Sequence, residues 1–228
     1  MNEIYKLKSK KELAGIFCYG MKNGCGFLPC DWDLKQNRDA MKERIFIQDG
    51  VLACNKFVDD LDTFNLGLEP RSQVKLDVDL KNVVEYQIKF ELELEESKED
   101  GSFFELSHES LFNLDKPEPI LRVGVKDGFF SVSGIASGLS KEQTSFNKPI
   151  KVVWDKVMKF RIDMLLLDNN EGYLRIYMDD GKADVLVWSN STNTTLNQIF
   201  PRVWCRIGVV GGLSKAIFSN FTINNNDF

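Results

Sequence analysis

The strongest constraint on the fold is a run of strict alternation at residues 84–95, which read "VEYQIKFELELE". The apolar side chains of this run fall on one face: Val84, Tyr86, Ile88, Phe90, Leu92 and Leu94. Charged or polar residues take the opposite face. Because successive side chains of a β-strand point to opposite faces, the run predicts a long strand with one buried face and one solvated face.

Further strand-like segments follow from residue 69 to the C-terminus. They read "RSQVKLDV", "FFELSH", "ILRVGVKDGFFSVSG", "KVVW", "KFRIDMLLL", "GYLRIYMDDGKADVLVW", "RVWCRIGVV" and "AIFSNFTI". The turn signals "EDG", "KDG", "DNNEG" and "DDG" punctuate the series, and their Asp, Asn and Gly residues supply the positive φ angles that hairpins require. Many short strands with regular turn signals predict an all-β fold, an antiparallel sandwich or barrel.

The N-terminal part of the chain is less regular. A short helix is predicted for residues 34–45 ("LKQNRDAMKERI"), whereas "GMKNGCGFLPCDWD" is typical of a loop. An all-β sandwich of 228 residues commonly forms one unit. We therefore expect a single β-sandwich domain over residues 1–228, with residues 1–65 as its less regular N-terminal part.

The charge of the chain restricts its partners. A formal net charge of -5 argues against a nucleic acid or an anionic membrane as the partner, because either would need a basic footprint. No apolar run is long enough to cross a bilayer, and the N-terminus lacks the zones of a secretory signal peptide. We expect synthesis in the cytoplasm, with a phage or virus component as one setting that needs no signal peptide. The oligomeric state has no signature in the sequence.

The cysteines and acidic clusters bear on cofactors. Five cysteines are an odd number, and the spacing of Cys18, Cys25 and Cys30 does not match zinc-ligand patterns. We therefore expect no cofactor. The alternative left open is a structural calcium ion at "DDLD" or "DNNE", although turn chemistry explains both clusters.

Three segments together resemble strands of the jelly-roll polysaccharide lyases, the heparin-lyase, glucuronan-lyase and alginate-lyase group within the concanavalin A-like lectin and glucanase fold. The segment "EPRSQVKL" is similar to the Arg-Ser-Glu strand of that family, with Gln73 in the acidic position, and "FFELSHES" to the strand bearing a Gln-x-His pair. The segment "WCRIGVV" corresponds to the K-x-G-x-Y strand, with Arg206 for the lysine and Val210 for the tyrosine. The resemblance implies a jelly-roll β-sandwich whose concave sheet holds an extended glycan.

Candidate binding residues follow from these strands. Arg71, Gln73 and Lys75 alternate onto one strand face, which suits a surface for sugar hydroxyls and carboxylates. Trp32, in the loop "CDWD", is the candidate for stacking on a sugar ring. The expected partner is therefore a polysaccharide or another glycan.

Candidate catalytic residues are implied by the same resemblance. His108 would be the base or the carboxylate-neutralising partner, and Arg206 could hold a carboxylate bidentately. Glu105 lies three residues before His108, so an unbroken strand puts it on the opposite face. Tyr173 and Tyr177, at alternating positions, are an alternative source of a hydroxyl group.

The position of Val210 leaves the activity open. Elimination of a uronate polymer needs a group that neutralises the carboxylate, a base and an acid, and tyrosine commonly serves as acid or base in this family. Valine cannot exchange a proton. The resemblance implies a lyase-like protein that binds an acidic polysaccharide, with cleavage by β-elimination as the activity to test. The alternatives are a non-catalytic carbohydrate-binding module and a structural or adhesive virion protein with a lectin-like sandwich.

Overall fold

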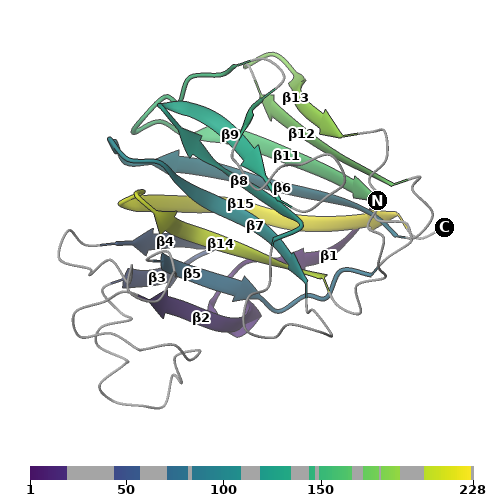
Figure 1. Cartoon of the computed structure of the whole chain (residues 1–228). Helices are drawn as coiled ribbons and strands as arrows, with labels where there is room; N and C mark the ends of the chain where they lie inside the picture. Colours follow the sequence, from purple (N-terminus) through teal and green to yellow (C-terminus); the bar gives the residue numbers. More distant parts are fainter. Residues whose placement is uncertain are drawn as a thin grey trace, which may run out of the picture.

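The computed structural model describes residues 1–19, 44–56, 71–81, 84–108, 119–134, 144–146, 149–165, 172–179, 181–190 and 203–226 (Figure 1). The described elements are the strands β1 (Asn2–Lys6), β2 (Leu13–Tyr19), β3 (Ile45–Gln48), β4 (Val51–Asn55), β5 (Arg71–Leu76), β6 (Glu85–Leu94), β7 (Gly101–His108), β8 (Leu121–Lys126), β9 (Phe129–Ser133), β10 (Thr144–Ser145), β11 (Met158–Leu165), β12 (Tyr173–Asp179), β13 (Asp184–Asn190), β14 (Val203–Gly211) and β15 (Lys215–Asn226), with a short 3-10 helix, η1 (Lys10–Glu12). No helix among these residues has the length and apolarity that a membrane span needs.

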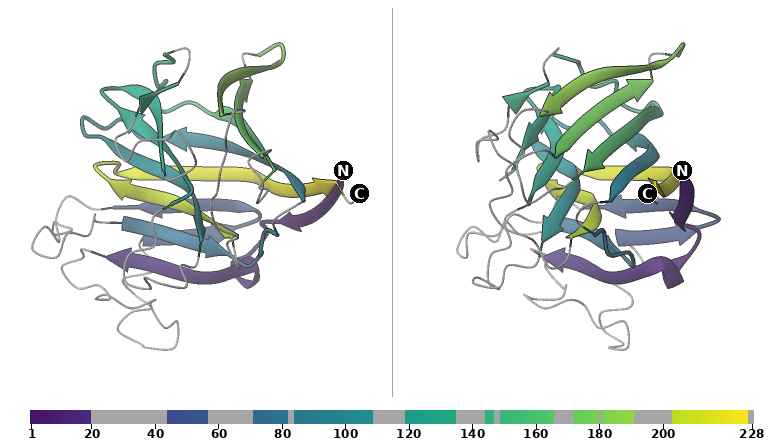
Figure 2. Two further views of the ribbon diagram at one scale, coloured as in Figure 1. Left: turned by 45° about the vertical axis from the view of Figure 1, so that its right-hand side comes forward. Right: turned by 90° about the vertical axis from the view of Figure 1, so that its right-hand side faces the viewer.

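The strands form two antiparallel sheets that pack as layers (Figure 2). The eight-stranded sheet has the order β13-β12-β11-β6-β15-β4-β3, with β1 also paired to β15. The order of the seven-stranded sheet is β10-β9-β8-β7-β14-β5-β2. About half of the strand pairs join strands that are not consecutive in sequence, as β6 between β11 and β15 illustrates. The predicted all-β antiparallel sandwich is confirmed.

The alternating run at residues 84–95 forms the central strand β6, and its apolar face is buried as predicted. Phe90 of this strand stacks on Phe104 of the other sheet, with 5.6 Å between ring centroids. Phe160 and Phe221 stack on Phe90 at 5.3 Å and 5.5 Å. Burying each such side chain contributes about 1.5–3 kcal/mol, so this aromatic cluster is a large part of what joins the two sheets.

The less regular N-terminal part supplies four strands that were not predicted. Strand β2 is the edge of the seven-stranded sheet, and β3 and β4 end the eight-stranded sheet. Of the helix predicted for residues 34–45, residues 34–43 lie outside the described residues, and Ile45 begins β3. Strand β1 shows little alternation of apolar and polar residues, and Tyr5 is its one buried residue.

The predicted strand "KVVW" at residues 151–154 is wrong. This segment runs past the turn of the β8–β9 hairpin, where Lys151 forms a single bridge with Phe129. The Val152 N–H then donates to the Gly128 carbonyl, and the Val152 side chain is buried. Its apolar residues cover the end of a hairpin rather than extend a sheet, so β-branched composition alone did not make a strand.

Candidate functional site

The seven-stranded sheet has a core-facing side and an opposite side, which we call the outer face. In β14, Val203, Cys205, Ile207 and Val209 belong to the core, so Trp204, Arg206 and Val210 lie on the outer face. The same alternation applies to β7, where Phe104 and Leu106 are core residues, and to β8, where Leu121, Val123 and Val125 are. Glu105 and Arg122 therefore project from the outer face of these strands.

Basic side chains gather on this outer face. In the five adjacent strands β5, β14, β7, β8 and β9, the lysines and arginines belong to β5, β8 and β14, and all lie on the outer face: Arg71, Lys75, Arg122, Lys126 and Arg206. Within these five strands Glu105 is the one acidic residue. The chain as a whole has a net charge of -5, whereas basic residues outnumber acidic ones five to one within these described strands.

Glu105 lies at the centre of this face. The strand register forms a row across four strands, in which Arg122 pairs with Glu105, Glu105 with Arg206, and Arg206 with Lys75. Arg122 donates from Nε to Oε1 of Glu105 at 2.8 Å, and Arg71 Nη1 lies 3.9 Å from Oε2. The side chain of Glu105 is only 2% exposed, so its carboxylate is a buried charge held by two guanidinium groups.

The surroundings of Glu105 keep it ionised. Burial has the largest effect on its pKa and by itself would raise it. The positive charges of Arg71 and Arg122 oppose burial most strongly, and Arg206 and Gln73 add smaller contributions. The net result is a pKa below the ordinary value of glutamate, so Glu105 is a carboxylate at neutral pH.

Gln73 and Trp204 each carry a buried donor on the outer face. Gln73 is fully buried, and its Oε1 accepts a hydrogen bond from Arg71 Nη1 at 3.3 Å. Trp204 is 8% exposed, and its Nε1 is without a partner. Lys75 Nζ lies 3.7 Å from the centroid of the Trp204 ring. The indole is therefore covered by a cation and is not an open stacking surface.

The structure brings four of the predicted site residues together. Arg71, Gln73 and Lys75 project from one face of β5, and Arg206 stands opposite Lys75 on the adjacent strand. Gly208, between Arg206 and Val210, faces Gln73 with a φ of +146°. A Cβ at Gly208 would lie 2.2 Å from the Ser72 carbonyl oxygen, so only glycine allows this close approach of β14 to β5.

The predicted base, His108, falls at a different register position from the rest of the site. The backbone pairs His108 with Val203, a core residue, and pairs Glu105 with Arg206. Positions 105 and 108 therefore lie on opposite faces of β7, as the alternation indicated, and the His108 side chain lies outside the described part of the structure. The outer-face residues spaced as a Gln-x-His pair are Glu105 and Ser107, which is buried.

Val210 lies on the outer face in a row of small side chains. It pairs with Arg71 on one side and Ser102 on the other, and the row continues through Gly124 to Ser131. The hydroxyls of Ser102 and Ser131 are buried and make no hydrogen bond. None of the side chains beside Val210 in this row exchanges a proton near neutral pH.

The tyrosines considered as substitutes belong to the other sheet, so that expectation was wrong. Tyr173 and Tyr177 lie on β12 of the eight-stranded sheet, with the core between them and the site. Tyr173 donates a hydrogen bond to Glu85, and burial followed by this bond raises the pKa of its hydroxyl. The guanidinium of Arg161 stacks on Tyr177 at 3.8 Å. Strand order, which the sequence does not reveal, decided this placement.

Other predicted elements of the site are outside the described residues. Trp32 and both acidic clusters considered for calcium fall there. Within the described ranges, no group of three or more histidine, cysteine, aspartate or glutamate residues is arranged to hold a metal ion.

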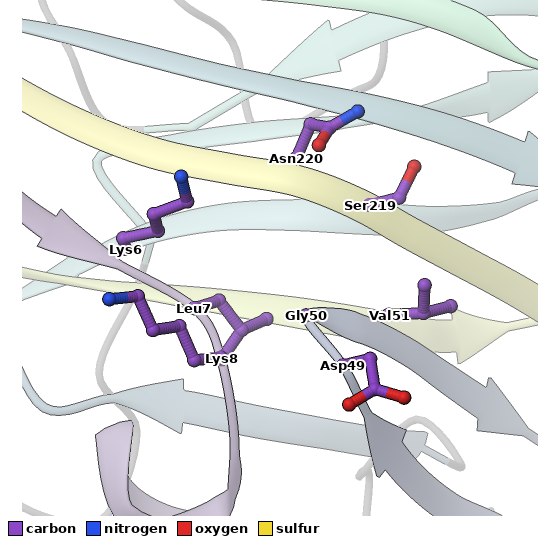
Figure 3. A pocket seen from close by; sticks show the side chains of 8 residues that line it. All are labelled: Lys6, Leu7, Lys8, Asp49, Gly50, Val51, Ser219 and Asn220. Atoms are coloured by element: carbon purple, nitrogen blue, oxygen red, sulfur yellow. The ribbon is translucent and has the colours of Figure 1, made fainter.

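A pocket of about 340 Å³ opens on the eight-stranded sheet, away from the outer face of the other sheet (Figure 3). It is lined by Lys6, Leu7, Lys8, Asp49, Gly50, Val51, Ser219 and Asn220. The Lys8 and Asp49 side chains extend in different directions in Figure 3. Ser219 and Asn220 both donate to Glu91, at 3.0 Å and 2.9 Å. The polar groups that line this pocket do not converge on a common point, so we do not treat the pocket as the functional site.

Comparisons with known proteins identify the fold. No family model matches the sequence, and no curated protein matches it. Among solved structures, an endo-β-1,4-glucuronan lyase from Trichoderma reesei is similar over 76% of this chain and 79% of its own, with a TM-score of 0.57 and 10% identity. An alginate lyase in complex with an alginate trisaccharide is similar over 94% of this chain and 100% of its own, with a TM-score of 0.56 and 12% identity.

A further alginate lyase, from Pseudomonas aeruginosa, is similar over 81% of this chain and 86% of its own, with a TM-score of 0.54 and 10% identity. At such low identity the likeness establishes the fold alone. The chain has the jelly-roll fold of these polysaccharide lyases, as the sequence resemblance predicted.

Proposed function

We propose that the outer face of the seven-stranded sheet binds an acidic polysaccharide. The observation that carries this proposal is the gathering of five basic side chains against a single carboxylate on five adjacent strands. Lysine and arginine side chains pair with carboxylate and sulfate groups, and guanidinium groups do so bidentately. The presence of an alginate trisaccharide in one structure of the same fold supports a glycan as the ligand.

We place the function in recognition rather than in cleavage. Elimination requires a base and an acid beside the sugar, and Val210 provides neither. Glu105 is a poor base because two arginines hold its carboxylate and its pKa is lowered. The alternative is a lyase in which His108 is the base and Arg206 neutralises the carboxylate of the substrate. It requires both residues at one site, whereas the strand register puts positions 108 and 206 on opposite faces of the sheet.

One experiment separates these functions. The purified protein is titrated with heparin, glucuronan, alginate and a neutral glucan at low and high salt, and the ultraviolet absorbance of unsaturated product is followed in parallel. We expect binding of the acidic polymers that weakens with salt, no binding of the neutral glucan, and a flat absorbance trace. Equal binding of the neutral glucan would overturn the proposal, and a rising absorbance that His108→Ala abolishes would establish the lyase alternative.

A further inference from the structure

The charges on the outer face follow a fixed order across the strands. Along the row of paired residues they are a cation at Arg122, the carboxylate of Glu105, and cations at Arg206 and Lys75. Neighbouring strands lie about 4.8 Å apart, so the backbones of Arg122 and Arg206 are about 10 Å apart with Glu105 midway. A polymer that crosses the strands along this row passes over a cation, an anion and then two cations.

The charge of Glu105 acts on whatever lies above it. Its side chain is 2% exposed, and water screens a buried charge much less than an exposed one. The field of this carboxylate makes the position above Glu105 less favourable for an anionic group than for a neutral sugar unit. Arg122 at 2.8 Å and Arg71 at 3.9 Å also interact with Glu105, and this weakens their attraction for a ligand carboxylate at this point.

From this arrangement we infer that Glu105 is a specificity-determining residue that selects against polymers with an anionic group on every sugar. The favoured class is a polymer in which a uronate alternates with a neutral sugar, because such a chain places charge over the flanking cations and a neutral unit over Glu105. This inference rests on the proposed function, since it concerns the same outer face.

The test compares two polymers in two variants. Dissociation constants are measured for polyglucuronate and hyaluronan oligosaccharides of equal length, with the wild-type chain and with Glu105→Gln. The readout is the ratio of the two constants in each protein. We expect Glu105→Gln to tighten binding of polyglucuronate about tenfold and that of hyaluronan less than about threefold, which shifts the ratio toward polyglucuronate.

A matched control separates the position of the charge from its mere removal. Glu3→Gln removes one carboxylate from β1 of the other sheet, at an exposed position. This variant changes the net charge by the same amount as Glu105→Gln, and we expect its ratio to stay at the wild-type value. If Glu3→Gln and Glu105→Gln shift the ratio equally, net charge explains the effect and the inference is wrong.

A second variant keeps the test valid if Glu105→Gln does not fold. Replacing both members of the pair, Glu105→Gln with Arg122→Gln, leaves no buried charge without a partner at that contact. Because the anion is gone, the ratio should still shift toward polyglucuronate, although both polymers bind more weakly than they do to Glu105→Gln. Folding of each variant is checked by circular dichroism.

The outcomes distinguish failure of the inference from failure of the proposed function. A wild-type chain that binds neither polymer contradicts the proposed function and, with it, the inference. If the wild-type chain binds both polymers and the ratio is unchanged in every folded Glu105 variant, the inference alone is wrong and Glu105 serves only to hold the arginines.

Discussion

Arg122 and Glu105 form a partly buried ion pair between β8 and β7, with Nε of the arginine 2.8 Å from Oε1 of the carboxylate. The pair lies on the side of the sheet that faces away from the core, and Arg71 approaches the second carboxylate oxygen. Sequence reasoning identified Arg71 as a candidate but did not identify the acid that it approaches. Stability, pH dependence and ligand binding of this protein should all depend on this group of three residues.

Removing Arg122 should destabilise the fold. The variant Arg122→Met leaves the buried carboxylate of Glu105 without its closest partner, and breaking a buried pair from one side typically costs about 3–5 kcal/mol. Because Arg71 remains within 3.9 Å, we expect a loss of about 2–3 kcal/mol in the free energy of unfolding. Urea denaturation measures this loss. The control Lys159→Met removes a lysine whose partner Asp179 is 3.6 Å away at an exposed site, and should cost less than about 1 kcal/mol.

The same carboxylate should contribute to acid unfolding. Because the pKa of Glu105 is lowered in the folded state, its stabilisation is present above the unfolded-state pKa, about 4.3, and is lost as the pH falls through the folded-state value. The free energy of unfolding of the wild-type chain should therefore fall on acidification, and Glu105→Gln should remove this part of the slope. Denaturant unfolding over a series of pH values tests this prediction. Identical slopes in the two proteins would mean that folding does not change the pKa of Glu105.

Gly208 should be intolerant of a side chain. A Cβ there would lie 2.2 Å from the Ser72 carbonyl oxygen and 2.7 Å from Gln73 Cα, so Gly208→Ala must push β14 away from β5. We expect a loss of about 3 kcal/mol or failure to fold. Gly128→Ala is the matched control, because its φ is also positive, at +77°, but nothing lies within 4 Å of a Cβ there. That control should cost about 1 kcal/mol, and equal losses in the two variants would show that backbone strain rather than contact is decisive.

Local alternation predicted those parts of the fold in which one strand face is fully buried. The run at residues 84–95 identified β6 because each second residue contacts the core. Alternation also predicted that Arg71, Gln73 and Lys75 share one face of their strand. The register of β5 confirms this, because they pair with alternate residues of β14. The first four strands were missed because they are short or lie at a sheet edge. Strand β1 buries Tyr5 alone, and β4, between β15 and β3, has only five residues.

The pairing between strands limited what the sequence could reveal of the site. Glu105 meets Arg122 because β7 and β8 pair in one register, which no local pattern specifies. A shift of one residue along a strand moves a side chain to the other face, and this separates His108 from Ser107. The sequence did contain a signal for the position of Glu105. Phe104 and Leu106 are core residues, so Glu105 and Ser107 lie together on the opposite face of the strand.

The central claim is that the outer face of the seven-stranded sheet binds an acidic polysaccharide, and one measurement tests it most directly. Hyaluronan oligosaccharide is titrated into the wild-type chain, into Arg206→Gln on that face, and into Arg175→Gln on β12 of the other sheet. The two variants lose the same charge, so net charge cannot distinguish them. We predict that Arg206→Gln weakens binding about tenfold and reduces its salt dependence, whereas Arg175→Gln stays within about twofold of the wild-type affinity. Equal effects of the two substitutions, or no binding by the wild-type chain, would contradict the claim.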